Sequence, residues 1–481
     1  MISSTADSGL LHEPGRARIV ALVVAVAFFM QLLDSTIVIT SLPQMGRDFG
    51  VPPVAMSIGL TVYLLTMAAF IPLSGWLGDR FGARTVFMAS IAIFTAASLF
   101  CGLSASLEQF IAARAVQGFG SALMTPVGRV IVLRNAPKSE LVHAVALITW
   151  PALIAPVIGP LLGSLVTTYL SWHWNFYINL PIGLAGLALV RRFVPDQREE
   201  GAGQLDIPGF LLSALGLTLL LAGLEAFTQG TAGLPLVALL LAGGIVLGVA
   251  ATWHFRRVAN PLIDLSAFGV RTFALSTLSA GTALRTSINA TPFLIPLFLQ
   301  LGFGLDAIAA GTYLLVYFAG NLAMKTLTTR TLRRFGFRRV LVANGLIAGG
   351  SIAACGFVSP ATPDAVIMAL FFLAGLSRSM QFTALNTLGF ADIAPEQRSS
   401  ASTLSSMLQQ VSMLLGIAIA AAILNLSSLL RDGSGTPLAD FRLAFLVVGA
   451  IGMAASLRFV TLPPDAGADV SGHKAKNRAS K

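Results

Sequence analysis

Residues 75–84 read GWLGDRFGAR and form a short polar stretch between two long apolar runs, 54–74 and 83–104. Each run is long enough to cross a bilayer as a helix, which takes about 20 residues. Gly75 and Gly82 allow a tight turn and a close approach of the two helices, because glycine has no Cβ. The stretch therefore predicts a corner between two membrane-spanning helices.

Three charged residues of this corner are expected to act in conformational gating, together with the two glycines. Asp79 precedes the second helix, where a carboxylate can accept backbone N–H groups and is favoured by the helix dipole. Arg80 and Arg84 are expected to form ion pairs that break when the protein switches conformation. The alternative is a plain turn whose charges only set the orientation of the chain.

The composition of the whole chain is typical of a membrane protein. Of its 481 residues, 55% are hydrophobic and 11% are charged, whereas soluble domains are about 25% charged. Cys101 and Cys355 both lie in apolar segments, so neither a disulfide framework nor a metal site is expected. The first apolar run is too long for the core of a cleavable signal peptide. We expect an all-α polytopic membrane protein.

The hydropathy pattern predicts fourteen spans. They are 19–41, 54–74, 83–104, 106–133, 143–168, 174–192, 208–229, 233–255, 272–301, 307–330, 339–360, 363–388, 400–427 and 441–461. An even number of spans places both termini on the same side of the membrane.

The distribution of basic residues predicts that this side is the cytoplasm. One set of loops and tails holds 23 of the 31 Lys and Arg residues, the other set holds 3, and 5 lie within spans. Basic residues are enriched in cytoplasmic loops. Because the net charge of +10 follows this distribution, no nucleic acid partner is expected. We expect an integral protein of the cell (inner) membrane with both termini cytoplasmic.

An internal repeat divides the chain. FGARTV at 81–86 recurs as FGFRRV at 335–340, which is 254 residues later, and the dipeptide CG at 101–102 recurs at 355–356 with the same offset. Repeated halves with a site between them at mid-membrane depth are typical of secondary transporters. The repeat therefore favours two six-helix halves with two extra helices between them.

The simplest division of the chain has four parts. They are an N-terminal six-helix half at 1–192, a cytoplasmic linker with two extra transmembrane helices at 193–257, a C-terminal six-helix half at 258–462 and a basic cytoplasmic tail at 463–481. The tail is polar, and we expect it to be disordered and to contact anionic lipid. In the second half Arg333 stands at the position of Asp79, so the gating contacts are expected to be asymmetric.

Asp34 is an acid in a span that is otherwise nearly uncharged. A charge near the bilayer centre costs about 2.5–3.5 kcal/mol on insertion scales. Asp34 and Arg114, on the fourth span, each lie about 10–12 Å below the outer end of their helices. Because these depths match, we expect an ion pair that couples transport to protons. The alternatives are a structural hydrogen-bonded acid and an arginine that binds backbone carbonyls.

The fifth span contains a glycine-proline pattern, APVIGPLLGS at 155–164. Gly159 and Gly163 form a face of small residues for close helix packing. Pro160 bends the helix, because it lacks a backbone donor. We expect these three residues to act in conformational gating.

Several of these motifs resemble those of a known family. The corner at 75–84 is similar to the signature loop of the major facilitator superfamily. RAVQGFG at 114–120 is similar to its fourth-helix motif, and residues 155–164 are similar to its antiporter motif. WHWNFYINLPIG at 172–183 and LDSTIV at 33–38 resemble the fourteen-helix drug:proton antiporter family within it.

This resemblance implies the major facilitator fold and a proton-driven exporter of the multidrug-resistance type. It covers nearly the whole chain, and its motifs are denser in the first half. Ile39 stands where that family usually has asparagine.

The second half has intramembrane cations that outnumber its acids. Arg285 and Arg378 lie near mid-depth, about 20 Å from a helix end, and a cavity with excess positive charge attracts anions. The expected residues of the substrate cavity are Gln31, Gln117, Arg285, Asn289, Arg378 and Gln381. The alternative is that both arginines bind backbone carbonyls at proline breaks of a helix.

We expect a proton-coupled efflux transporter that exports amphiphilic drugs or organic metabolites by alternating access. The alternative is a proton-coupled transporter, in either direction, of an organic anion or metal chelate.

An enzyme is not expected, because no nucleophile–base pair is recognisable. No cofactor is expected, because the chain lacks a Gly-x-x-x-x-Gly-Lys-Ser/Thr loop for ATP, so the proton gradient would supply the energy. The expected partners are a small-molecule substrate, protons and membrane lipid; a monomer is expected, alone or with an accessory export protein.

Overall fold

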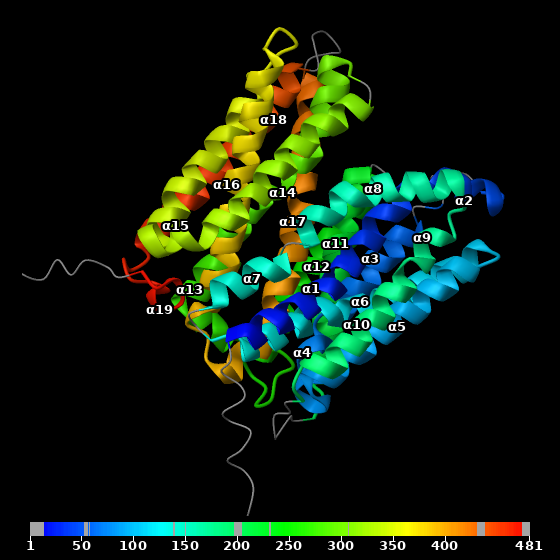
Figure 1. The fold of residues 1–481 in the computed structure, drawn as a ribbon, viewed down its shortest axis with the longest axis vertical. Helices are drawn as coiled ribbons and strands as arrows, with labels where there is room; N and C mark the ends of the chain where they lie inside the picture. The colour runs from blue at the N-terminus through cyan, green and yellow to red at the C-terminus, as the bar shows by residue number, and fades with distance from the viewer. Residues whose placement is uncertain are drawn as a thin grey trace, which may run out of the picture. The chain divides into compact units, whose positions relative to one another are not determined.

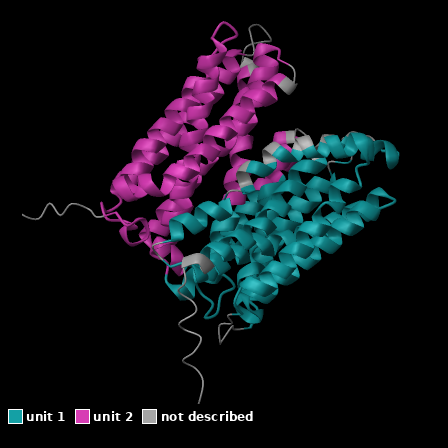
Figure 2. Cartoon of the chain, viewed as in Figure 1, with its two compact units in different colours: residues 1–222, 242–265, 394–407 teal, residues 223–241, 266–393, 408–481 magenta. Residues whose placement is uncertain are grey.

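Helices make up the described part of the chain. The computed structural model describes residues 14–51, 56, 58–137, 140–149, 151–196, 204–229, 232–305, 307–430 and 438–473, and these ranges contain no strand (Figure 1). The chain clusters into two compact units (Figure 2). Unit 1 comprises residues 1–222, 242–265 and 394–407, and unit 2 comprises residues 223–241, 266–393 and 408–481.

Unit 1 is built mainly from the N-terminal helices. They are α1 (Pro14–Ile37), α2 (Leu42–Asp48), α3 (Ile58–Phe70), α4 (Leu73–Phe81), α5 (Ala83–Leu103), α6 (Leu107–Asn135), α7 (Leu141–Thr149), α8 (Pro151–Tyr169), α9 (Trp174–Tyr177) and α10 (Asn179–Phe193). Most of α11 (Ile207–Gln229), the end of α12 (Leu234–Phe255) and the first turns of α17 (Arg398–Leu430) belong to the same unit. Its largest apolar core joins α1, α5, α6 and α10 through buried residues such as Phe87 and Ile131.

Unit 2 contains the helices of the second half. They are α13 (Arg271–Phe273), α14 (Ala280–Leu297), α15 (Ala307–Cys355), α16 (Asp364–Ala391), most of α17, α18 (Leu438–Leu457) and α19 (Ala468–Ser471). Two π-helical turns, η6 (Ala274–Leu278) and η7 (Phe298–Gly302), flank α14. Helix α15 is two helices merged at Gly336, where the backbone is not helical.

Each of the fourteen predicted spans carries helix. Eight helices of the described part are long and apolar enough to cross a membrane by themselves, or nine if α3 and α4, which are bent by 59°, count as one span. The other predicted spans do not pass this test as single helices, and some of them are interrupted, as where α7 gives way to α8 and where π-helical turns flank α14. The all-α fold is therefore confirmed, and several spans are broken rather than straight.

The extra helices expose many apolar side chains. Leu236, Leu239, Ile245 and Val249 of α12 are each at least half exposed. Exposed apolar surface of this extent is unfavourable in water. Because the chain is a multi-pass membrane protein, these side chains are suited to contact lipid.

The predicted corner and its repeat share one backbone conformation. Gly82 has a φ of 86° between α4 and α5, and Gly336 has a φ of 74° within α15. A side chain with a Cβ disfavours such a positive φ, so glycine suits both corners. Cys101 and Cys355 are both fully buried near the end of the helix that follows the corner. The structure thus agrees with the predicted repeat, whereas the domain boundaries at 192, 257 and 462 stay predictions.

The first residues of the tail are folded, which corrects the expectation of disorder. Helix α19 lies between Gly467 and Gly472, and Val470 within it is 2% exposed. His473 Nδ1 lies 3.0 Å from the carbonyl oxygen of Arg333 in α15. Val470 is an apolar residue in a polar segment. Its burial accounts for the folding of α19 onto the protein, because burial removes apolar surface from water. Residues 474–481 lie outside the described part.

Gly159 of α8 allows a close approach to α1. A Cβ built at Gly159 would lie 2.1 Å from Thr36 Oγ1 and 2.8 Å from Thr36 Cβ, and Thr36 Oγ1 donates a 3.1 Å hydrogen bond to the Ala155 carbonyl of α8. Gly163 is buried on the same helix, and the side chain of Pro160 lies outside the described part.

Gly159→Ala is therefore expected to destabilise the protein by about 1–3 kcal/mol, the usual cost of overpacking a well-packed interior. The measurement is the thermal unfolding midpoint of the purified protein in detergent. Gly350→Ala is the matched control, because a Cβ at Gly350 meets no atom within 4 Å. Equal midpoints for the two variants would contradict the packing role of Gly159.

Candidate functional site

Asp34 and Arg114 form a buried ion pair in unit 1. Arg114 Nη1 lies 2.7 Å from Asp34 Oδ2, and both side chains are 0% exposed. The pair forms because Asp34 lies three residues before the end of α1 and Arg114 lies in the second turn of α6. The structure therefore brings together the two residues that the matching depths predicted. Their role in proton coupling stays a prediction.

Neutral side chains complete the surroundings of the carboxylate. Gln117 Nε2 and Asn179 Nδ2 donate hydrogen bonds of 2.9 and 2.8 Å to Asp34 Oδ1. Both amides also donate to the hydroxyl of Ser98, at 2.8 and 3.2 Å. Gln117, Asn179 and Ser98 are each 0% exposed. Three donors, one each from Arg114, Gln117 and Asn179, thus contact the carboxylate of Asp34.

Arg114 has further partners on α3. Its Nε donates to the Gly59 carbonyl at 3.3 Å, and its guanidinium carbon lies 4.3 Å from the centre of the Tyr63 ring. Contact with an aromatic face stabilises a desolvated cation. Nη2 of Arg114 is buried and has no hydrogen-bond partner among the described residues. Arg114 is thus fixed by α1, α3 and α6, with one donor group left over.

Tyr63 connects the ion pair to a second polar group. Its hydroxyl lies 2.6 Å from Ser121 Oγ, and Ser121 in turn contacts the sulfur of Met67 at 3.5 Å. Gln31 Nε2 contacts the same sulfur at 3.7 Å, and its Oε1 accepts from Thr125 at 3.1 Å. Gln31 therefore lies in this neighbouring group, one helical turn from Asp34.

The corner at 75–84 makes different contacts from those expected. Asp79 pairs with Arg134 at the end of α6, at 3.2 Å, and does not cap α5, whose N-terminal residue has no side-chain cap. The cause is the positive φ of Gly82, which turns the chain between Asp79 and the start of α5. Arg84 donates to the carbonyl of Arg191 at 2.7 Å instead of to an acid. Arg80 is exposed.

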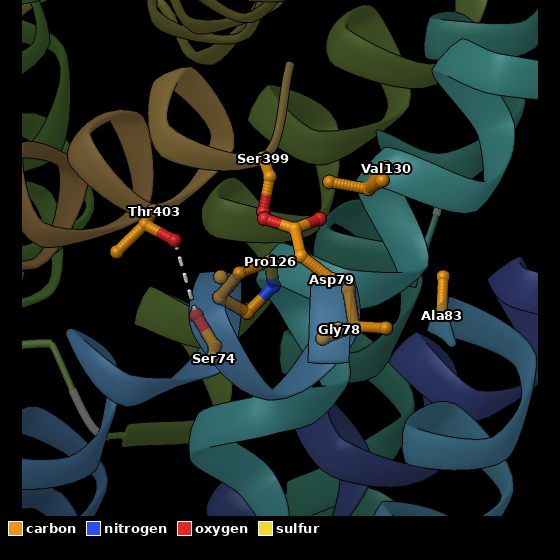
Figure 3. A pocket seen from close by; sticks show the side chains of 10 residues that line it. Ser74, Gly78, Asp79, Ala83, Pro126, Val130, Ser399 and Thr403 are labelled. Carbon is orange, nitrogen blue, oxygen red and sulfur yellow. Dashed lines mark hydrogen bonds between the residues drawn. The ribbon is translucent and has the colours of Figure 1, made fainter. Parts of the chain in front are cut away.

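A small pocket adjoins this corner within unit 1. It is lined by α4, α6 and the first turns of α17, and Figure 3 shows the Asp79 carboxylate and the Ser399 hydroxyl pointing toward one another. Ser74 Oγ lies 3.2 Å from Thr403 Oγ1. A Cβ at Gly75 would lie 2.9 Å from the same Thr403 oxygen, so Gly75 allows α17 to approach α4. Asp79 and Gly75 thus lie at a contact between α4 and α17.

The expected cavity residues of the second half do not form one group. Arg285 donates to the Ser276 carbonyl at 2.7 Å and to Asn386 Oδ1 at 3.1 Å. Ser276 lies in the π-helical turn η6, so the alternative of a helix break fits Arg285, although the break is not at a proline. Asn289 is half-buried one turn away on α14.

Gln381 is engaged in helix packing. It is 0% exposed, donates to the Leu341 carbonyl at 3.0 Å and accepts from Asn344 Nδ2 at 2.9 Å. Gln117 belongs to the surroundings of Asp34. The predicted cavity set is thus divided among at least three places, and its role in substrate binding stays a prediction.

Sequence reasoning missed three residues of the Asp34 group, namely Ser98, Tyr63 and Asn179. Asn179 could have been found, because it lies within WHWNFYINLPIG at 172–183. Ser98 and Tyr63 had no such signal, since a serine or tyrosine in a long apolar run is common. No cluster of three or more His, Cys, Asp or Glu side chains suited to a metal occurs within the ranges that the structure describes.

A repeated bundle of membrane-spanning helices with a buried ion pair defines a membrane transporter and not an enzyme. The chain belongs to the Major Facilitator Superfamily, whose family model matches residues 24–388 and 275–480. It is 37% identical over 462 residues to the candidate multidrug resistance protein MdtD of Escherichia coli O6:H1 (strain CFT073), which covers 95% of this chain and 97% of that protein. MdtD of Shigella flexneri gives the same identity and coverage.

Solved structures share the fold. The human organic anion transporter MFSD10 aligns with a TM-score of 0.63 at 15% identity, covering 92% of this chain and 99% of that one. The proton:xylose symporter XylE aligns with a TM-score of 0.60 at 16% identity, covering 94% and 97%. At such low identity these likenesses establish the major facilitator fold alone.

Proposed function

We propose that this protein is a proton-coupled antiporter that exports amphiphilic drugs or organic metabolites. The observation that carries the proposal is the fully buried ion pair of Asp34 and Arg114 inside unit 1. An ionisable pair buried in a membrane-spanning bundle is costly and marks an ion or proton pathway in many transporters. The 37% identity to a protein named for multidrug resistance supports the drug class.

Protonation of Asp34 would change the contacts of Arg114. A proton on Asp34 removes the ion pair and leaves Arg114 with Gly59 and Tyr63 as its remaining partners outside α6. Because α1, α3 and α6 meet at this pair, loss of the pair would alter how these helices pack. A substrate that favours the altered packing would then compete with or follow the proton.

Export direction rests on resemblance. The glycine-proline pattern at 155–164 resembles an antiporter motif, and its Gly159 packs closely on α1 near the ion pair. We further propose that both termini are cytoplasmic, because 23 of 31 basic residues lie in the corresponding loops and tails.

The contact of α4 with α17 is proposed to act in gating. Helix α17 begins in unit 1 and continues in unit 2, so a change at its first turns is carried along the same helix. Gly75→Val should therefore lower the transport rate several-fold by obstructing Thr403. Gly78→Ala is the control, because a Cβ at Gly78 would meet its nearest atom, on Val127, at an ordinary 3.8 Å. The measurement is the initial transport rate at equal protein density, and equal rates for both variants would refute the gating role.

Transport in proteoliposomes tests the proposed function. Ethidium, a permanent cation, and 2-naphthoate, an anion, would each be offered with an inward or an outward pH gradient. An antiporter moves a substrate against the direction of the proton flow, so uptake should require a proton-rich interior. Uptake that requires a proton-rich exterior would show a symporter, and uptake without regard to the gradient would refute proton coupling.

A second candidate function is the transport of an organic anion or a metal chelate. The observation that favours it is Arg378 on α16, whose Nε and Nη1 atoms are buried without a hydrogen-bond partner among the described residues. In the same panel this function predicts transport of 2-naphthoate without transport of ethidium.

A further inference from the structure

Arg378 differs from Arg114 and Arg285 in having two buried nitrogen atoms, Nε and Nη1, without a hydrogen-bond partner among the described residues. Arg114 has Asp34 as its ion-pair partner, and Arg285 binds a carbonyl and an amide oxygen. No acid of the described residues forms a recorded ion pair with Arg378, whose nearest aromatic contact is the Tyr317 ring at 5.8 Å. An arginine near the centre of a span costs about 2.5–3.5 kcal/mol on insertion scales. A compensating group is therefore favoured at this position.

Asn321 provides a second, independent sign of a polar ligand. It is 1% exposed, and neither its Nδ2 nor its Oδ1 has a partner within the described residues. Buried amides normally have hydrogen-bond partners. Asn321 lies one helical turn from Tyr317 on α15, on the helix that packs against Arg378. Two neighbouring helices thus each present an unsatisfied polar side chain.

The crossing of α15 and α16 explains why these groups are close. A Cβ at Gly375 would lie 1.9 Å from the Tyr317 carbonyl oxygen and 3.0 Å from Asn321 N. Only glycine allows this approach. Arg378 follows Gly375 by one helical turn, so the guanidinium emerges beside the same segment of α15. Lys325, one turn further along α15, donates to Thr383 Oγ1 of α16 at 2.8 Å.

The internal repeat shows that Arg378 has no charged counterpart at the corresponding position of the first half. Tyr317 lies 254 residues after Tyr63, and Gly118 approaches the carbonyl oxygen of Tyr63 as Gly375 approaches that of Tyr317. Gly375 corresponds in this way to Gly118, so Arg378 corresponds to Ser121, which hydrogen-bonds the Tyr63 hydroxyl. The second half thus has an arginine where the first half has a neutral partner for the tyrosine.

We propose that Arg378, Lys325 and Asn321 form a subsite for the oxyanion group of a substrate, a carboxylate, sulfonate or phosphate attached to an apolar body. This subsite rests on the proposed transport function and defines its substrate class. Arginine and lysine favour oxyanions through charge-assisted hydrogen bonds, and Asn321 Nδ2 adds a neutral donor. Arg378 lies about 20 Å from both ends of α16, a depth that suits a bound substrate better than the phosphate of a lipid headgroup.

Ligand-induced thermal stabilisation tests this subsite without a proton gradient. The probes are 2-naphthoate and its neutral analogue 2-naphthamide, added to the full-length protein in nanodiscs of phosphatidylcholine. A ligand that binds only the native state stabilises it in proportion to its affinity. The wild-type protein should bind naphthoate more tightly than naphthamide. Arg378→Gln should weaken naphthoate binding about tenfold to a hundredfold, as expected for a lost hydrogen bond to a charged group, and leave naphthamide binding unchanged.

Two further variants separate a ligand role from a structural role. Arg378→Lys should retain part of the preference for naphthoate, and Arg442→Gln, which alters an arginine that bonds the Gly356 carbonyl, should retain all of it. Without ligand, Arg378→Gln should raise the unfolding midpoint, because it removes an uncompensated charge. A lowered midpoint with unchanged naphthoate affinity would show a structural arginine and overturn the proposal.

The remaining outcomes are also decisive. Equal binding of naphthoate and naphthamide by the wild-type protein would overturn the subsite. Stabilisation by phosphatidylglycerol in the nanodiscs that is lost in Arg378→Gln, without a naphthoate effect, would assign the site to lipid and likewise overturn it. Failure of proton coupling in the transport panel, with naphthoate binding intact, would instead refute the proposed antiport and leave the subsite standing.

Discussion

Asp34→Asn is expected to abolish proton-driven transport while the protein still folds into the membrane. Asparagine resembles the protonated acid in shape and charge, so the variant is fixed in one of the two states that the proposed cycle requires. It can still accept from Gln117 or Asn179, but it cannot form the ion pair with Arg114. The measurement is substrate uptake into everted vesicles energised by a pH gradient, with the amount of protein in the membrane determined in parallel.

Asp440→Asn is the control for this variant. Asp440 is a buried acid at the start of α18, 6% exposed, and bonds to Ser427 in unit 2. Its replacement should leave proton-driven uptake largely intact. Full activity of Asp34→Asn would refute the assignment of Asp34 as the coupling residue.

Arg114→Gln is expected to cause the second large effect, a loss of both transport and stability. Removing one member of a buried ion pair typically costs about 3–5 kcal/mol, because the remaining charge is left uncompensated. Asp34 would keep the amides of Gln117 and Asn179 but lose its only described cation. The measurement is the thermal unfolding midpoint together with the uptake assay.

The double variant Asp34→Asn with Arg114→Gln separates stability from coupling. With both charges gone, much of the stability should return, and the coupling energy of residues in direct contact is commonly about 0.5–3 kcal/mol. Transport should not return, since no titratable group remains at the pair. If the double variant instead lost as much stability as the two single variants lose together, the ion pair would not be the stabilising contact.

The pair of Asp34 and Arg114 could be predicted from the sequence because a charged residue is conspicuous in an apolar helix. A charge in an apolar run is costly, and its depth follows from counting residues at a fixed rise. The corner at Gly82 was predictable for a similar reason, since its repeat at Gly336 marks the same positive φ. In both cases local geometry and sequence position determine where the residue lies in the fold.

Other contacts depend on features that residue counting does not reveal. The pairing of Asp79 with Arg134 depends on how the end of α6 packs beside α4. The carbonyl that binds Arg285 becomes available in a π-helical turn, which shifts the hydrogen-bond register by one residue. The folding of α19 depends on the burial of Val470, which no periodic pattern in so short a segment predicts.

Substrate-induced proton release is the measurement that tests the central claim most directly. Purified protein in weakly buffered detergent solution is mixed with substrate while a pH-sensitive dye reports free protons. If Asp34 carries the proton that competes with substrate, the wild-type protein should release protons on binding and Asp34→Asn should release none while still binding substrate. Equal proton release by the two proteins would contradict the account.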